Sequence, residues 1–144
     1  MPQEHELKIS RRFKAPREKV FNAFLEPAAL QAWWGPEGMT CPEPRVDARL
    51  GGAYELSILN DAGEPHTVAG VYQEITAPER LVFTWRWAHL PEAAEMLVTL
   101  TFNDVAGDTV LDLHQTLMPS GGSSRMHNQG WSSSFNKLDV FLSR

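Results

Sequence analysis

The last quarter of the chain carries the pattern that most restricts its fold. His127, Trp131, Phe135, Leu138 and Leu142 recur at intervals of three or four residues. This spacing places them on one face of an α-helix and leaves serines and charged residues on the other. A helix of about twenty residues is roughly 30 Å long and, with its side chains, about 10–12 Å wide. Such a helix must lie across another layer to bury its apolar face.

Patterns with a period of two predict that the other layer is a β-sheet. From Leu7 to Phe13, apolar residues alternate with polar ones, which is typical of a half-buried strand. Turn signals rich in glycine and asparagine separate the segments that follow. We expect seven antiparallel strands, of which the later six span 45–50, 53–59, 66–75, 80–87, 95–103 and 109–116.

Two short helices are expected between the first two strands. Pro16 suits the first position of a helix, because proline lacks the N–H group that would be unpaired there. Pro27 ends this helix and begins a second one, which carries Trp33 and Trp34 and stops at Gly35.

Composition and charge limit the class of protein. With 144 residues, 42% hydrophobic and 22% charged, the chain suits a single globular domain over 1–144. A net charge of −5 without a basic run does not favour nucleic acid or a membrane surface as a partner. Cys41 is the single cysteine, which excludes an internal disulfide and is expected to be a bystander. Without an export or membrane-spanning pattern, we expect a cytoplasmic location.

The widths of the two layers raise the question of a cavity. Seven strands about 4.8 Å apart make a sheet about 30 Å wide, of which one helix covers about a third. The sheet must curl around the helix, and the remaining space is either packed with side chains or open to a ligand. Strand parity and the helical stripe predict the lining: Trp33, Tyr54, Leu56, Ile58, Phe83, Trp85, Trp87, Met96, Val98, Leu100, Gln115, His127 and Trp131. The parity of 66–75 stays open, because both of its faces carry apolar residues.

Several motifs together resemble a known family. These are Trp33-Trp34-Gly35-Pro36, Gly51-Gly52, the segment 78–85, and His127 four residues before Trp131. The chain resembles, over nearly its whole length, bacterial proteins similar to the activator of heat-shock-protein-90 ATPase, in the START-like, Bet v 1-like (SRPBCC) superfamily. The resemblance implies an α+β helix-grip fold: a seven-stranded curved antiparallel sheet wrapped around a long C-terminal helix, with two short helices between strands 1 and 2 and a hydrophobic cavity. It implies no reaction, because this frame hosts carriers, receptors, cyclases and hydratases.

Few residues suggest chemistry. The histidines are scattered without the close spacing of a metal site, so we expect neither a metal nor a cofactor. The serines at 132–134 are expected to face outward without a base, and His114 to face solvent. His127 could hydrogen-bond a ligand or act as a general base, or it could simply bond a backbone carbonyl. Gln115 is the other polar group expected to point inward.

Three hypotheses follow. We favour a cytoplasmic protein that binds a small apolar or aromatic molecule between the long helix and the sheet. The second is a cyclase- or hydratase-type enzyme with His127 as base, although we name no catalytic residue and do not expect catalysis. The third is an interaction module for a chaperone or a partner subunit, which needs an exposed apolar patch. It ranks below ligand binding, because the eukaryotic activator uses an additional N-terminal domain. A homodimer is left open.

Overall fold

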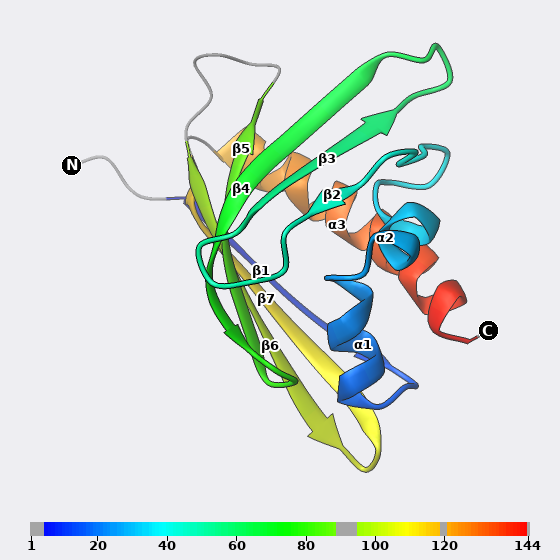
Figure 1. The fold of residues 1–144 in the computed structure, drawn as a ribbon, viewed down its shortest axis with the longest axis vertical. Helices are drawn as coiled ribbons and strands as arrows, with labels where there is room; N and C mark the ends of the chain where they lie inside the picture. The colour runs from blue at the N-terminus through cyan, green and yellow to red at the C-terminus, as the bar shows by residue number, and fades with distance from the viewer. Residues whose placement is uncertain (1–4, 89–94, 119–120, 144) are drawn as a thin grey trace.

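The computed structural model describes residues 5–88, 95–118 and 121–143, and Figure 1 shows their arrangement. Within these ranges seven strands form one antiparallel sheet in the order β1-β7-β6-β5-β4-β3-β2. The strands are β1 (His5–Phe13), β2 (Arg45–Val46), β3 (Ala53–Leu59), β4 (Pro65–Thr76), β5 (Arg80–Trp87), β6 (Met96–Val105) and β7 (Asp108–Met118). The helices are α1 (Arg17–Ala23), α2 (Pro27–Trp33) and α3 (Gly121–Leu142). The predicted α+β helix-grip architecture is confirmed.

The sheet bends around α3, and α2 packs against the same helix (Figure 1). The C-terminal half of α3 supplies Phe135, Leu138 and Leu142, all of which are buried. Helix α3 also contacts β1 and β7, while α1 packs against β6 and β7. The apolar stripe predicted from the sequence is therefore the face by which α3 meets the sheet.

Aromatic side chains fill the interior beside this half of α3. The rings of Phe13 and Phe135 meet edge to face with centroids 5.8 Å apart, and those of Phe24 and Trp33 do so at 4.8 Å. Trp33 is fully buried, and its indole Nε1 donates a hydrogen bond to the carbonyl oxygen of Ala23 at 2.9 Å. Edge-to-face contact is a favoured arrangement of aromatic rings, so this part of the interior is a packed core.

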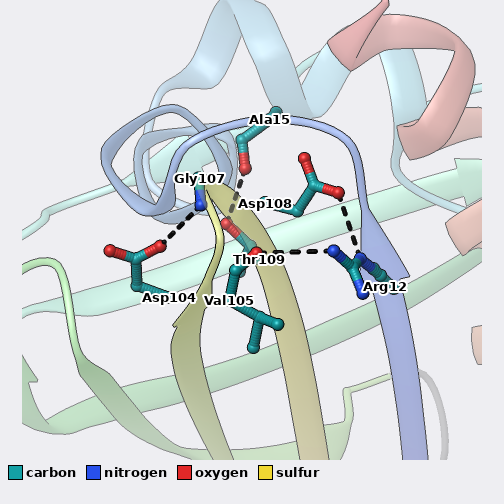
Figure 2. Close-up of polar contacts among 7 residues, drawn as sticks. All are labelled: Arg12, Ala15, Asp104, Val105, Gly107, Asp108 and Thr109. Carbon is teal, nitrogen blue, oxygen red and sulfur yellow. Dashed lines mark hydrogen bonds and ion pairs between the residues drawn. The ribbon is translucent and has the colours of Figure 1, made fainter.

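The connection between β1 and α1, residues 14–16, is called the hook. It is held to the start of β7 by polar contacts, which Figure 2 shows. The buried hydroxyl of Thr109 donates to the carbonyl oxygen of Ala15 at 2.7 Å. Beside it, Arg12 pairs with Asp108 at 3.0 Å between Nε and Oδ2. The tight β6–β7 turn uses Gly107 at a positive φ of 87°. These contacts hold the start of α1, and hence the segment leading to α2, against β7.

Several boundaries differ from those expected. Strand β2 ends at Val46 instead of residue 50, because the chain turns where the N–H groups of Arg49 and Gly52 bond the carbonyl oxygens of Asp47 and Arg49. Strands β6 and β7 are longer than predicted, since the turn between them takes only Ala106 and Gly107. Pro16 caps α1 in an extended conformation and is not its first helical residue.

The Ser/Gly-rich run 120–124 is predicted by its composition to be a flexible joint before the last helix. Gly121 begins α3, so the run is mostly the first turn of the helix and not a flexible joint. The same composition offers Ser120, Ser123 and Ser124 as candidates for the residue that caps this helix. Ser123 and Ser124 lie inside α3, and Ser120 lies outside the described residues.

Two kinds of feature are absent from the described ranges. None of their helices combines the length and the apolar character needed to cross a lipid bilayer. Nor do three His, Cys, Asp or Glu side chains of this part of the chain gather where they could hold a metal ion.

Candidate ligand-binding cavity

A cavity of about 320 Å³ lies between the N-terminal half of α3 and strands β3, β4 and β5. Strand β3 contributes Leu56 and Ile58 to its wall, and β5 contributes Trp85 and Trp87. The volume falls at the lower end of the range found for small-molecule sites, about 300–1,000 Å³. The cavity and the packed core thus lie along opposite halves of the same helix.

Helix α3 presents a small residue to the cavity. Gly130 lines it, one residue before Trp131. A Cβ atom built at Gly130 would meet no atom within 4 Å outside its own helical surroundings. Glycine inside a helix costs about 1 kcal/mol relative to alanine, and here its missing side chain leaves space between helix and sheet.

Indole rings form much of the wall. Trp34 lies 5.8 Å from Trp85 and 5.4 Å from Trp131, and the last two are 5.2 Å apart, all between ring centroids. The Nε1 of Trp131 donates to Oε1 of Gln115 at 2.9 Å, and Nε2 of Gln115 contacts Sδ of Met96 at 3.2 Å. Because Gln115 is fully buried, this bond fixes the indole of Trp131 against the sheet.

Two buried nitrogens of the wall have no hydrogen-bond partner in the described structure: Nε1 of Trp85 and Nε2 of His127. The rings of these residues meet edge to face, with centroids 5.5 Å apart. His127 is 5% exposed, and burial lowers its pKa from 6.5 to about 4, because desolvation disfavours the imidazolium. The imidazole is therefore neutral at physiological pH.

The loop after α2 lines a further side of the cavity and is held to α3 by hydrogen bonds. The backbone N–H of Glu37 donates to Oγ of Ser133 at 2.7 Å, and Nδ2 of Asn136 donates to Oε1 of Glu37 at 3.0 Å. One helical turn after Ser133, Nζ of Lys137 donates to the carbonyl oxygen of Met39 at 2.9 Å. The polar face of α3 thus holds the loop while its apolar face meets the sheet.

Gly35 begins this loop at a position that requires glycine. Its φ is 95°, in the left-handed region that side chains disfavour. A Cβ atom there would lie 2.7 Å from Cγ2 of Ile58, which is too close for carbon atoms in contact. The absence of a side chain lets the loop approach β3 and complete the wall.

The structure brings six of the thirteen predicted lining residues to the cavity wall: Leu56, Ile58, Trp85, Trp87, His127 and Trp131. Trp33, Met96, Val98 and Leu100 are instead packed in the core, and Gln115 is occupied by Trp131. Tyr54 and Phe83 border a separate void of about 10 Å³, room for about one water molecule. That any of them contacts a ligand stays a prediction.

Other wall residues were missed, for identifiable reasons. Trp34 is predicted to be part of the second helix with Trp33, but it lies beyond the last helical residue with extended backbone angles, φ −65° and ψ 136°. His66 and Val68 belong to the strand whose parity was left open. Ser134 follows His127 by seven residues, a helical spacing that marks the same face. The spacing signal existed, but serine was assumed to face outward.

The structure bears on three predictions about polar side chains. The expectation that all three serines of 132–134 face outward is wrong, because Ser134 is buried and its hydroxyl donates to the carbonyl oxygen of Gly130 at 2.8 Å. His114 bonds Glu6 at 2.8 Å with 41% of its side chain exposed, as its outward parity predicted. Burial raises the pKa of the Cys41 thiol to about 11, which keeps it protonated and unreactive at neutral pH.

Comparison with solved structures identifies relatives that cover nearly the whole chain. Protein CV1439 from Chromobacterium violaceum is 33% identical, with a TM-score of 0.87 over 96% of this chain and 97% of that one. The AHSA1 (SPO3351) protein from Silicibacter pomeroyi is 30% identical, with a TM-score of 0.86 over 96% and 98%.

Among curated proteins, the chain is 28% identical over 109 residues to the uncharacterized protein C1711.08 from Schizosaccharomyces pombe. The match covers 76% of this chain but 29% of that protein, so the chain spans under a third of this relative's length. The family model described as Activator of Hsp90 ATPase homolog 1-like protein matches residues 14–143. The chain therefore belongs to the Activator of Hsp90 ATPase homolog 1-like family, within the START-like helix-grip superfamily.

Proposed function

We propose that this protein binds a small apolar or aromatic molecule in the cavity between α3 and strands β3–β5. One observation carries the proposal: indole rings and aliphatic side chains surround about 320 Å³ of space in a domain whose other half is tightly packed. Apolar pockets of this size with few polar groups are typical small-molecule sites. Flat aromatic ligands also gain from stacking on, or meeting edge to face, the rings of Trp34, Trp85 and Trp131.

A catalytic role has less support. With a pKa of about 4, His127 is a weak base at neutral pH, whereas an effective general base has a pKa near the working pH. The described residues of the wall include no aspartate or glutamate that could raise this basicity. Binding without turnover is the simpler use of the same site.

A role as a chaperone-docking module also has less support. The large apolar side chains that are exposed in the described structure are spread over several elements, such as Leu50 before β3, Val105 at the end of β6 and Val140 near the end of α3. Single exposed apolar residues are normal on soluble domains, and an interaction site usually needs a contiguous patch.

The proposal is tested by filling the cavity from the helix side. Gly130→Leu places a side chain where no neighbour lies within 4 Å of the Cβ atom, so it fills the cavity without a backbone clash. We expect it to weaken binding of the neutral fluorophore N-phenyl-1-naphthylamine by at least about tenfold. Gly130→Ala is the matched control, because it supplies the same gain in helix propensity with little loss of volume.

Fluorescence titration of the three proteins measures these affinities, and thermal unfolding checks that each is folded. Wild-type protein that does not bind the fluorophore, or equal affinity of the wild type and Gly130→Leu, would contradict binding in this cavity. Native mass spectrometry of freshly purified protein provides an independent test, since a retained small molecule should be present in the wild type and reduced in Gly130→Leu.

A further inference from the structure

The polar groups of the cavity wall indicate what kind of ligand fits it. Two of them have partners within the protein: Trp131 donates to Gln115, and Ser134 donates to the carbonyl oxygen of Gly130. Nε1 of Trp85 and Nε2 of His127 do not. These two residues are 6% and 5% exposed, and both border the cavity. Water outside the domain therefore does not satisfy them.

The two nitrogens have complementary chemistry. The indole Nε1 of Trp85 is a hydrogen-bond donor only, while a neutral imidazole carries one donor and one acceptor nitrogen. When the proton of His127 is on Nδ1, its Nε2 accepts. A hydroxyl group matches this pair, because its oxygen accepts from Trp85 while its hydrogen is donated to His127. With ring centroids 5.5 Å apart, the two side chains are close enough to contact one small group.

Side chains must move for a ligand to reach the two nitrogens. Both nitrogens are covered by neighbouring protein atoms in the structure, but the rings that carry them form part of the wall. A half-turn of the imidazole about its Cβ–Cγ bond exchanges the positions of Nε2 and Cε1. A ligand that supplies a partner for these nitrogens relieves the free-energy cost of burying them unpaired.

Charge restricts the ligand further. The described residues of the wall include no Asp, Glu, Lys or Arg, and burial keeps the His127 imidazole neutral. An ionised ligand would lose its hydration on entering such a site without gaining a counter-charge, which is costly. A neutral molecule does not incur this cost.

We propose that the ligand is a neutral, largely apolar or aromatic molecule that carries a hydroxyl group, and that this hydroxyl pairs with Nε1 of Trp85 and Nε2 of His127. This inference rests on the proposed binding function and specifies the ligand class for the same cavity. The remaining wall, formed by residues such as Leu56, Ile58, Val68 and Trp131, surrounds the apolar body of the ligand.

Three probes of the same shape test the inference: naphthalene, 2-naphthol and 2-naphthoate, each titrated into the protein by calorimetry at neutral pH. We expect 2-naphthol to bind about tenfold more tightly than naphthalene, since each hydrogen bond to a buried group adds up to about tenfold in affinity. The carboxylate should bind most weakly of the three. Trp85→Phe removes the donor and His127→Leu removes the acceptor, so each should lower the ratio of the naphthol affinity to the naphthalene affinity several-fold.

The outcomes separate this inference from the proposed function. Binding of naphthalene and naphthol with equal affinity, tightest binding of naphthoate, or a naphthol preference that both substitutions leave intact would overturn the hydroxyl assignment and leave the cavity as a binding site. If none of the three probes nor N-phenyl-1-naphthylamine binds, the proposed function fails and the inference with it. Thermal unfolding checks that each variant is folded.

Discussion

At the scale of single residues, the cavity depends on a few side chains with unusual surroundings. His127 is buried among indole rings at 5.5 Å from Trp85 and 6.0 Å from Trp87, measured between centroids. Gly130 leaves open space next to them, and Gly35 lets the opposite loop come close to Ile58. Each of these residues does little for the packing of the core, and each determines the form of the wall.

The buried imidazole predicts a dependence of stability on pH. In the unfolded chain His127 titrates near 6.5, and in the folded protein near 4, so the unfolded state binds more protons between these values. The free energy of unfolding should therefore fall as the pH decreases from 6.5 to 4, by roughly 2–3 kcal/mol from this residue. Urea titrations of the wild type and His127→Leu across this range measure the effect.

The variant serves as the control, because it lacks the titrating group. The difference in unfolding free energy between the two proteins should be constant above pH 7 and should move in favour of His127→Leu as the pH is lowered. Parallel curves for the two proteins over the whole range would show that His127 is not buried as described. At neutral pH, removal of one unpaired buried nitrogen should stabilise the variant by about 1 kcal/mol.

At the scale of elements, the loop after α2 that lines the cavity is held mainly by hydrogen bonds to the polar face of α3. Lys137 is central here, since its Nζ donates to the carbonyl oxygens of Met39 at 2.9 Å and Trp34 at 3.4 Å. Partial burial lowers the pKa of this ammonium group, and Glu37 raises it. The two anchored carbonyls lie on either side of the loop, so one side chain spans it.

Lys137→Met should loosen this loop without unfolding the domain. The methionine keeps the length of the aliphatic stem but cannot donate, so the loop loses hydrogen bonds to a charged group. We expect destabilisation of about 1 kcal/mol, together with faster amide hydrogen exchange over 35–40 and faster release of N-phenyl-1-naphthylamine. Lys14→Met, which removes an exposed lysine, is the control. Unchanged exchange over 35–40 would show that Lys137 does not hold the loop.

The elements also show how far sequence patterns determine such a fold. Periodicity predicted the strand and helix order, because the sheet and α3 each bury one face and repeat their apolar residues accordingly. The parity of β4 could not be predicted, because its register shifts between Tyr72 and Glu74. Before this irregularity Val68 and Tyr72 face the interior while Val71 is 42% exposed. Single-strand patterns do not encode where a bulge falls.

The sequence pattern likewise could not predict which inward-facing residues line the cavity and which pack in the core. Met96, Val98 and Leu100 have the same inward parity as the predicted wall, but they face packed side chains. Which inward residues border open space depends on the angle at which α3 crosses the sheet and on where the loop after Trp34 lies. Both are properties of the assembled fold and not of any local spacing.

At the scale of the whole molecule, the hook between β1 and α1 joins segments that are distant in sequence. The hydrogen bond from Thr109 to Ala15 is fully buried, whereas the nearby pair of Arg12 and Asp108 is exposed to solvent with 53% and 29% of the two side chains accessible (Figure 2). A buried hydrogen bond leaves an unpaired acceptor when its donor is removed, while an exposed ion pair is replaced by water.

Thr109→Val should therefore destabilise the protein more than Arg12→Met does. Valine keeps the shape of threonine but leaves the carbonyl oxygen of Ala15 unpaired, which costs about 2 kcal/mol. Loss of the exposed ion pair should cost less than about 1 kcal/mol. Chemical denaturation measures the free energy of unfolding of both variants. A larger loss of unfolding free energy for Arg12→Met than for Thr109→Val would contradict this prediction.

The cavity and the packed core lie along opposite halves of α3, so the residues that stabilise the fold are separate from those that line the cavity. Phe135, Leu138 and Leu142 anchor the domain at one end, while Met126, His127, Gly130, Trp131 and Ser134 border the cavity at the other. Substitutions near Gly130 can therefore change which ligand the molecule recognises while the packing that stabilises the fold stays intact. Such a scaffold is suited to diversification, in nature or in the laboratory, because new recognition does not have to be traded against the ability to fold.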